Sequence, residues 1–312
     1  MRKFMLQTVI NEFPFRIGYE DDILLLGSCF SDDIGAKFSY FSFNSLSNPH
    51  GTIFHPDVIA RNILEGLSDQ MKVRQVERDG IILSYNAGSQ IYGTDPEQLI
   101  ERLNERNEQL KKYLLSSKVI FITFGTAWGY IEKESAEVVA NCHKVPSQHF
   151  EKRLSSVEEM EKNWLETIDK IKKVNPSVKI VLTVSPVRHS KEGLVENNRS
   201  KARLIELAYR LSGKDDIFYF PSYEILIDEL RDYRFYKKDL VHPSSEAIEI
   251  IWERLIQHVL DEKDVYLLEL IGQYRSMCDH DLMHPESSSA SSFEKRKADL
   301  KEKILSSGIE IK

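Results

Sequence analysis

The sequence predicts an α/β fold in which helices cover both faces of a parallel sheet, giving a three-layer αβα sandwich of the flavodoxin-like kind. Short apolar runs of strand length recur along the chain, and each is followed by a helical pattern. These runs are continuous rather than alternating, as expected for strands buried on both faces. With 41% hydrophobic and 29% charged residues among 312, the chain can bury a core.

The core strands are predicted in chain order at residues 23–26, 118–124, 178–184 and 217–220. A helix should begin directly after the first strand, because Ser31, Asp32 and Asp33 offer capping and acidic first-turn side chains. Further helices are predicted at about 95–114, 155–174, 200–211 and 244–260. Ligands of such sheets bind beyond the carboxyl ends of the strands, so candidate site residues are sought there.

The remaining segments complete the organisation. A hairpin insertion is predicted at residues 73–94, because Asp79-Gly80 supplies the positive φ angles of a tight turn. Residues 44–57 and 126–154 are expected to be long loops. Residues 1–278 should form a single domain with its core at about 20–260. The Ser/Lys/Glu-rich residues 279–312 should form an exposed linker with a weak terminal helix.

Composition and motifs exclude several classes. The chain has 42 Lys and Arg against 49 Asp and Glu, a net charge of −7, which argues against a nucleic-acid binder. It has no P-loop and no GxGxxG, and no cofactor is expected. No apolar run approaches the ~18 residues of a membrane helix, and residues 1–15 lack the apolar core of a signal peptide, so a soluble cytoplasmic protein is expected.

The three cysteines are an odd number in a long chain, so each is expected to be a thiol rather than part of a disulfide framework. Cys29 falls at the predicted start of the helix after the first strand. A helix N-terminus lowers a thiol pKa and stabilises an oxyanion, so this is a suitable position for a nucleophile. The alternative is a small buried apolar side chain.

A second element strengthens the catalytic interpretation. Asp239 and His242 lie three residues apart on one short segment just before a predicted helix. In that spacing a carboxylate can orient an imidazole and stabilise the imidazolium that forms after proton transfer. Alone, such a pair is common in solvated loops, but together with the cysteine turn it is a more specific signal of a catalytic site.

These features resemble the SGNH or GDSL hydrolase superfamily, and more closely the GSCFA family. The motif that names the family stands here as Gly27-Ser28-Cys29-Phe30-Ser31, with Ser31 in place of the usual alanine. The further blocks follow in the family's order over about residues 20–260, as Asn48-Pro49-His50-Gly51, Gly125-Thr126-Ala127-Trp128, Asn141-Cys142-His143-Lys144, Ser185-Pro186-Val187-Arg188-His189 and Asp239-Leu240-Val241-His242-Pro243. The resemblance implies an SGNH-like fold and an ester-hydrolysing site.

Aligned on the superfamily, Cys29 takes the nucleophile position, and Ser28 is the rival nucleophile. The resemblance implies His242 as the general base and Asp239 as the residue that orients it. A cysteine nucleophile would form a thioester, which either water or a sugar hydroxyl can resolve. His189 is an alternative base.

The oxyanion hole departs from the superfamily pattern, because Ala127 stands where an Asn donor is usual. The candidate donors are the N–H groups of Cys29 and Gly51, with Thr126, Asn141 or His143 replacing the missing side chain. Arg188 could clamp an anionic substrate group, and His143, Lys144 and His189 are further candidates for substrate binding. Cys142 and His143 are adjacent without a second spaced pair, so no metal site is expected.

Three functional hypotheses follow. The first is an acyl or acetyl esterase acting on a small-molecule or glycan ester through Cys29, His242 and Asp239. The second is an O-acyltransferase that passes the same acyl group to a glycan. The third is a non-catalytic binding protein on a degenerate SGNH scaffold, suggested by the missing Asn donor. The sequence specifies neither the acyl group nor the oligomeric state.

Overall fold

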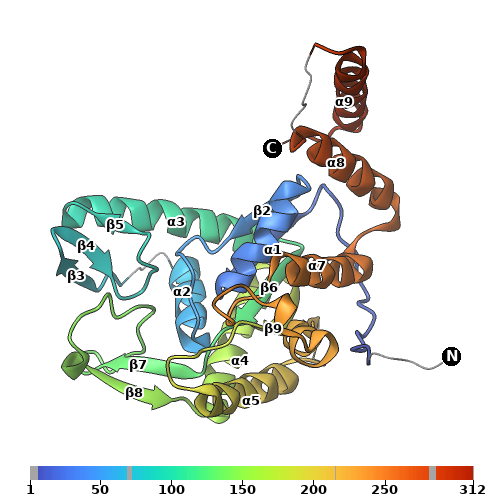
Figure 1. Cartoon of the computed structure of the whole chain (residues 1–312). Coiled ribbons are helices and arrows are strands. Elements are labelled where there is room, and N and C mark those ends of the chain that lie inside the picture. The colour runs from blue at the N-terminus through green and yellow to red at the C-terminus, as the bar shows by residue number, and fades with distance from the viewer. Residues whose placement is uncertain (1–5, 69–71, 215, 281–285, 312) are drawn as a thin grey trace.

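A computed structural model describes residues 6–68, 72–214, 216–280 and 286–311 (Figure 1). Its central sheet has five parallel strands, β1 Asp22–Gly27, β2 Asn44–Ser47, β6 Val119–Phe124, β9 Lys179–Val184 and β10 Ile217–Tyr219. They are ordered β10-β9-β6-β1-β2. Taken along the chain, this is the doubly wound order 2-1-3-4-5 of flavodoxin-like sheets. The predicted fold class is confirmed.

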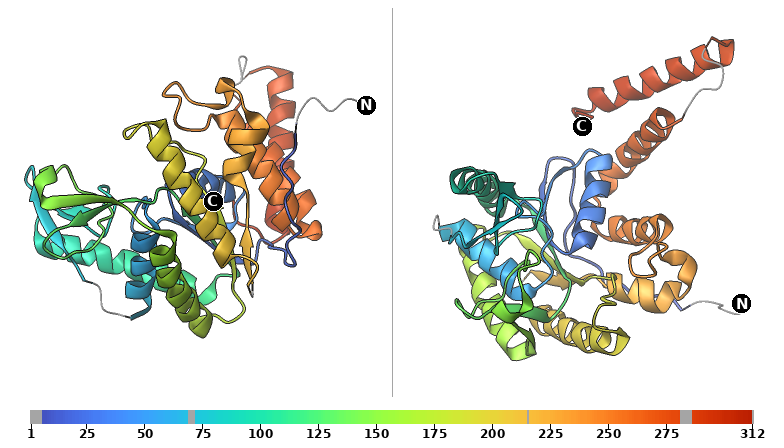
Figure 2. Two further views of the ribbon diagram at one scale, coloured as in Figure 1. Left: turned by 90° about the horizontal axis from the view of Figure 1, so that it is seen from below. Right: turned by 60° about the vertical axis from the view of Figure 1, so that its left-hand side comes forward.

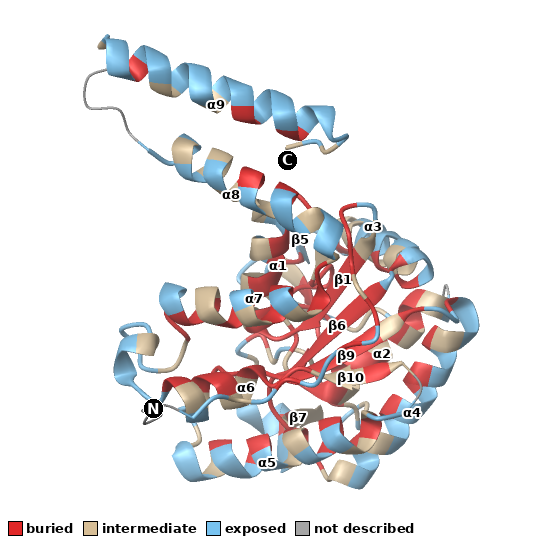
Figure 3. Cartoon of the chain, turned by 90° about the vertical axis from the view of Figure 1, so that its right-hand side faces the viewer, coloured by how far each residue is buried: buried red, intermediate tan, exposed pale blue. Residues whose placement is uncertain are grey.

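Helices cover both faces of this sheet, and the strands divide their side chains between two cores. In β1, Ile23 and Leu25 face one core, whereas Leu24 and Leu26 face the other, because successive strand residues point to opposite sides. The first core is closed by α1 Cys29–Tyr40 and α7 Ser245–Val259. The second is closed by α2 Pro56–Ser68, α3 Pro96–Ser116, α4 Val157–Val174 and α5 Leu194–Leu211. Figure 3 shows the strands almost wholly buried between these layers.

Two small antiparallel sheets lie together at one end of the molecule (Figures 1 and 2). The first contains β3 Gln75–Arg78, β4 Ile81–Ser84 and β5 Tyr92–Gly93, so the hairpin insertion is confirmed. The second pairs β7 Trp128–Glu132 with β8 Phe150–Leu154. The irregular loop predicted at 126–154 is therefore wrong in part, because two strands separated by a long connection carry no tight-turn signal.

The segment 44–57, predicted as a loop, contains the edge strand β2 and the start of α2 at Pro56. The sequence Asn-Ser-Leu-Ser has little intrinsic strand preference. The neighbouring strand decides its conformation instead, since β2 pairs in parallel with β1 from Asp22↔Asn44 to Leu25↔Ser47.

The last part of the chain forms a helical arm. After α6 Ser222–Glu224, the π-helix Ile225–Leu230 and α7, the chain continues into α8 Val265–Cys278 and α9 Ser288–Ser306. Short 3₁₀ helices occur elsewhere in the chain, at Ser147–His149, Tyr233–Phe235 and Glu262–Asp264. Helix α9 packs on α8 and is otherwise exposed (Figure 3). The serine run predicted as a linker begins α9 instead, because Ser287 Oγ caps the helix by accepting the N–H of Ala290 at 3.1 Å. The domain boundary at 278 stays a prediction.

Among the residues described, no helix is both long enough and apolar enough to cross a membrane.

Candidate active site

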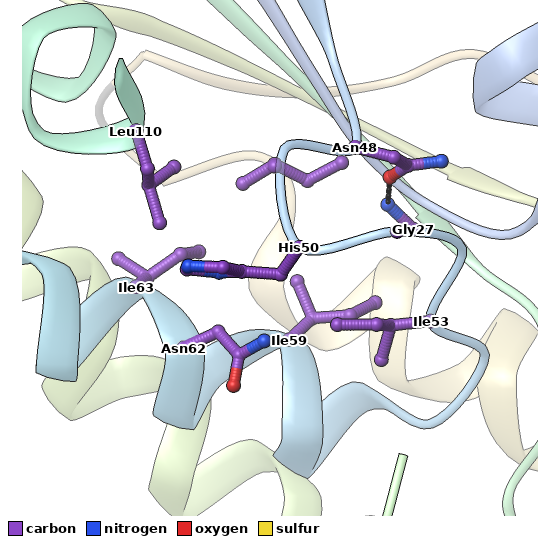
Figure 4. Close-up of a pocket in the computed structure, with 10 residues that line it drawn as sticks. Gly27, Asn48, His50, Ile53, Ile59, Asn62, Ile63 and Leu110 are labelled. Atoms are coloured by element: carbon purple, nitrogen blue, oxygen red, sulfur yellow. Dashed lines mark hydrogen bonds between the residues drawn. The ribbon is translucent and has the colours of Figure 1, made fainter. Parts of the chain in front are cut away.

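The candidate site lies at the carboxyl end of the sheet, where β1 and β6 run side by side and the strand order reverses. Gly27, the last residue of β1, has φ +130°, and its N–H donates to Asn48 Oδ1 at 2.7 Å (Figure 4). The next N–H, of Ser28, donates to Thr123 O on β6 at 3.2 Å. This turn fixes the start of α1 at the topological switch point, where doubly wound proteins bind ligands.

The two candidate nucleophiles have different roles in this turn. Ser28 is only 1% exposed, and its Oγ accepts the N–H of Phe30 at 3.4 Å as the N-cap of α1. Cys29 is the first helical residue and is half-buried. Its own N–H heads the helix, where backbone donors have no partner in the preceding turn. The hydroxyl of Ser28 is thus used by the helix, whereas Cys29 caps nothing.

The environment of Cys29 favours the protonated thiol over the thiolate. Burial, together with the negative charges of Asp33 and Asp32, raises the pKa of the Cys29 thiol to about 11. The expectation that the helix N-terminus lowers this pKa is therefore not met, because desolvation and the first-turn aspartates outweigh it. A nucleophilic role for Cys29 would therefore require a proton acceptor.

Asp239 and His242 form the pair that their spacing predicts. Asp239 Oδ2 accepts a hydrogen bond from His242 Nδ1 at 2.7 Å. The other oxygen, Oδ1, accepts the backbone N–H groups of Val241 at 2.9 Å and His242 at 3.0 Å. These bonds lower the pKa of Asp239 and keep it ionised. Nε2 of His242 is thereby left as the ring atom that can exchange a proton.

The loop that carries this pair lies beside the other strand ends. The N–H of Arg188, after β9, donates to Val241 O at 3.2 Å. Burial raises the pKa of Asp33 on α1, and the charges of Lys237 and His242 oppose that rise. His242 is therefore close enough to the first turns of α1 to influence a carboxylate four residues beyond Cys29.

His189, the alternative base, is half-buried next to the same groups. Burial, with the positive charge of Lys201 and that of His242 adding to it, lowers the pKa of His189 to about 4. Its ring lies edge-on to Phe54, with centroids 5.8 Å apart, and the backbone N–H of His189 donates to Asn197 Oδ1 at 2.9 Å. A ring with so low a pKa is a weak proton acceptor at neutral pH.

Several predicted oxyanion donors are already engaged. The Gly51 N–H donates to Asn48 O at 2.7 Å, closing a turn. The Thr126 N–H donates to Phe54 O at 3.0 Å, and its Oγ1 contacts Ser200 Oγ at 3.1 Å. In this conformation neither N–H is free to bind an oxyanion. Of the predicted backbone donors, the N–H of Cys29 remains, at the N-terminus of α1.

The Asn141-to-Lys144 block turns its residues to different environments. Asn141 is exposed, and its Nδ2 donates to Ser89 Oγ at 3.0 Å. His143 is buried, with Nε2 2.7 Å from Ser84 O and Nδ1 3.3 Å from Ser89 Oγ, so it ties the block to the small sheet. Lys144, by contrast, is exposed and lines a cavity.

His50 of the Asn48-to-Gly51 block points into the interior. Its ring enters a small cavity of about 20 Å³ between Ile63 and Leu110 (Figure 4). Burial, with a contribution from Arg106, lowers the pKa of His50 to about 4. The residue of this block that contacts the candidate site is instead Asn48, whose Nδ2 donates to Asp32 Oδ1 at 2.8 Å while its Oδ1 accepts from Gly27.

A larger cavity, of about 440 Å³, lies between the carboxyl end of β6 and the small β7–β8 sheet. Aromatic side chains from both regions line it, with Lys144, Lys191 and His189 among the polar groups; the aromatic residues are Phe54, Trp128, Tyr130 and Phe150. Lys152 Nζ lies 5.0 Å from the Trp128 ring centroid. Because His189 belongs to this cavity and interacts with His242, the cavity adjoins the candidate catalytic groups.

One residue of the site was missed in the sequence. Lys201 on α5 is 1% exposed, and its Nζ donates to Gly125 O at 2.8 Å and to Ser185 O at 2.7 Å, at the ends of β6 and β9. A signal was available, because Lys201 precedes Leu204, Ala208 and Leu211 at helical spacing and so occupies the apolar face of α5. Among the residues described, no group of three or more His, Cys, Asp and Glu side chains is placed to hold a metal ion.

The fold and site together define a doubly wound α/β protein with a cysteine at the first strand-to-helix turn and an aspartate–histidine pair on a late loop. Residues 22–255 match the GSCFA family, and the chain belongs to that family. The resemblance found in the sequence is thereby confirmed.

Solved structures with a similar arrangement include carbohydrate esterases. One is a carbohydrate esterase of family 3 from Talaromyces cellulolyticus, with 9% identity and a TM-score of 0.37, covering 81% of this chain and 99% of that one. Another is an acetyl xylan esterase from Butyrivibrio proteoclasticus, with 10% identity and a TM-score of 0.40, covering 82% of this chain and 65% of that one. No curated protein matches the chain.

Proposed function

We propose that this protein is an esterase-type hydrolase that removes an acyl group from a small-molecule or glycan ester through Cys29, His242 and Asp239. The observation that carries the proposal is the Asp239–His242 pair, with a 2.7 Å bond to Nδ1, on a loop that reaches the first turns of α1. That bond leaves Nε2 as the acid–base atom, as in hydrolases that use a nucleophile, a histidine and a carboxylate.

The reaction has two steps. His242 Nε2 takes the proton of the Cys29 thiol while Sγ attacks the ester carbonyl, and the alkoxide leaves with that proton as the acyl C–O bond breaks. Water then gives a proton to His242 and attacks the thioester, the C–S bond breaks, and His242 returns that proton to the sulfur. The pKa of about 11 at Cys29 fits this order, because a protonated thiol needs the base at the moment of attack.

Cys29 is preferred over Ser28 as the nucleophile. Ser28 is 1% exposed, and its hydroxyl accepts the Phe30 N–H, so its lone pair serves the helix. Cys29 is half-buried and heads α1, where its N–H can also bind the developing oxyanion.

The 440 Å³ cavity is the proposed substrate site. Its Trp128 and Tyr130 rings offer apolar faces for a sugar ring, and Lys144 and Lys191 can contact hydroxyl or anionic substituents. If a sugar hydroxyl bound here instead of water, the same thioester would be resolved by acyl transfer, which makes an O-acyltransferase the second candidate function.

The test combines turnover with trapping of the intermediate. Purified protein is assayed with p-nitrophenyl acetate, and the peptide containing Cys29 is examined by mass spectrometry for an acetyl group after rapid acid quench. We expect turnover that falls at least about 10³-fold in Cys29→Ala, with the acetylated peptide seen only when Cys29 is present. Adding cellobiose as an acceptor separates hydrolysis from transfer, because transfer yields acetylated sugar.

Ser28→Ala is the matched control. It should lose about 1 kcal/mol of stability with its cap but retain most of the turnover. A silent Cys29→Ala beside an inactive Ser28→Ala would reverse the assignment of the nucleophile. A folded protein with no turnover and no acetyl-enzyme would favour a binding protein on this scaffold.

A further inference from the structure

Lys201 is a buried cation at the centre of the candidate site. It projects from α5 to the carboxyl ends of two neighbouring strands, where its Nζ donates to Gly125 O at 2.8 Å and Ser185 O at 2.7 Å. The side chain is 1% exposed. An ammonium carries three protons, so these carbonyls leave one N–H position directed to a further partner.

The surroundings of Lys201 lack the usual partner of a buried lysine. Within the described part of the chain, no carboxylate pairs with it. Tyr223 places its ring 5.8 Å from Nζ, and the charged neighbours Arg188 and His189 are basic. A buried ammonium without a carboxylate is costly, and an apolar side chain would pack on this face of α5 without that cost.

Cys29 is the group near Lys201 that can become negative. The ends of β1 and β6 are joined by the Ser28 N–H bond to Thr123 O, which brings the start of α1 beside Gly125. The charge interactions agree, because Lys201 lowers the pKa of Cys29 against the larger effect of burial. Burial in turn lowers the pKa of Lys201 to about 7, and a charged Cys29 would raise it.

We propose that Lys201 is a positioning residue that stabilises the negative charge of Cys29 Sγ. Its ammonium attracts the thiolate that forms as His242 removes the thiol proton and that is released again when the thioester C–S bond breaks. Lys201 neither gains nor loses a proton in this cycle. Its hydrogen bonds to Gly125 and Ser185 hold it at the strand ends, so the charge is in place before substrate binds.

This inference rests on the proposed role of Cys29 as nucleophile, but its test needs no ester substrate. The rate of iodoacetamide alkylation at Cys29 is measured against pH by peptide mass spectrometry in wild type, Lys201→Gln and Lys201→Met. Both substitutions remove the charge, and Gln retains N–H donors for a strand-end carbonyl. Cys142 in the same samples is the internal control, since its pKa is also raised by burial and it lies outside the Lys201 environment.

We expect both variants to alkylate Cys29 about tenfold more slowly at about pH 6, below the pKa of about 7 at which Lys201 loses its charge; this corresponds to a thiol pKa one unit higher. Alkylation at Cys142 should not change. Arg199→Gln, which removes an exposed charge from the same helix, should leave the profile at Cys29 as in wild type. Unchanged Cys29 profiles in folded Lys201 variants would overturn the proposal, whatever the esterase assay shows.

If neither neutral variant folds, a measurement in a chain that keeps Lys201 takes its place. Iodoacetate is anionic and iodoacetamide is neutral, so a cation beside Sγ favours the first reagent. In His242→Gln, which removes the proposed proton acceptor of Cys29, the ratio of the iodoacetate rate to the iodoacetamide rate should fall as pH rises through about 7, where Lys201 loses its charge. A ratio that stays constant through this range contradicts the proposal.

Discussion

At the scale of single residues, two opposing effects act on the Cys29 thiol. The start of α1 offers the positive end of the helix dipole, which favours a thiolate. Burial and the neighbouring Asp33 and Asp32 act the other way, and together they raise the pKa to about 11. The proposed mechanism therefore needs a base at the moment of attack, as it would with a serine nucleophile.

The Asp239 carboxylate should matter to kcat more than to KM. Asp239→Asn keeps the size of the side chain but removes the charge that stabilises the imidazolium of His242. We expect kcat for p-nitrophenyl acetate to fall at least about 10²-fold with KM little changed. Asp232→Asn is the matched control, because Asp232 Oδ1 also accepts a backbone N–H, that of Arg234 at 2.9 Å, in an exposed turn nearby. Equal losses in the two variants would indicate a structural role only.

His50 should make stability depend on pH. Its pKa is about 4 in the folded chain and 6.5 without the fold, so the folded state binds the proton less readily. Its contribution to stability, of order 3 kcal/mol, is complete above about pH 6.5 and is lost as pH falls toward about 4. We expect His50→Leu to flatten the dependence of the unfolding free energy on pH over this range, measured by urea denaturation.

The exposed His149 provides the control for that experiment. His149→Asn should leave the slope of stability against pH unchanged, because its side chain is exposed to solvent in the folded chain as it is in the unfolded one. A His50→Leu variant with the wild-type slope would assign the acid sensitivity to other buried groups, such as His55 and His189, whose pKa values burial also lowers.

At the scale of elements, the β1-to-α1 turn positions Cys29, the proposed nucleophile, and tolerates no side chain at Gly27. A Cβ there would lie 2.1 Å from Thr123 O on β6, and φ is +130°. Gly27→Ala should therefore cost about 3 kcal/mol or more, because backbone of the central sheet would have to move. The midpoint of urea unfolding measures this loss.

Gly80, in the turn of the β3–β4 hairpin, separates the two causes of that cost. Its φ is +79°, but nothing lies within 4 Å of an added Cβ. Gly80→Ala should cost only about 1 kcal/mol, the penalty of the backbone conformation alone. If the two substitutions had the same effect, the close approach of β1 and β6 would contribute nothing beyond that penalty.

At the scale of the whole molecule, the site and the C-terminal arm lie apart. The arm projects away from the sheet, with α9 resting on α8 (Figure 1). A chain ending at residue 278 should keep kcat/KM within about twofold of the full chain. It should associate more readily, because Leu300 and Ile304 no longer cover apolar surface. A loss of activity above tenfold, with the shortened chain folded, would place the arm in the working site.

The sequence by itself determined the core strands, most of the helices, the Asp239–His242 pair and the place of Cys29, because each rests on local periodicity, capping or short spacing. Strand β2 and the β7–β8 pair could not be predicted from the sequence, since their stability comes from pairing with segments distant along the chain. The same is true of Lys201. A lysine on an apolar helix face is ambiguous until the strands it reaches are known. The tertiary structure also decided the ionisation of Cys29. The effect of the helix N-terminus comes from α1 alone, whereas the burial that raises the thiol pKa depends on every element packed around Cys29.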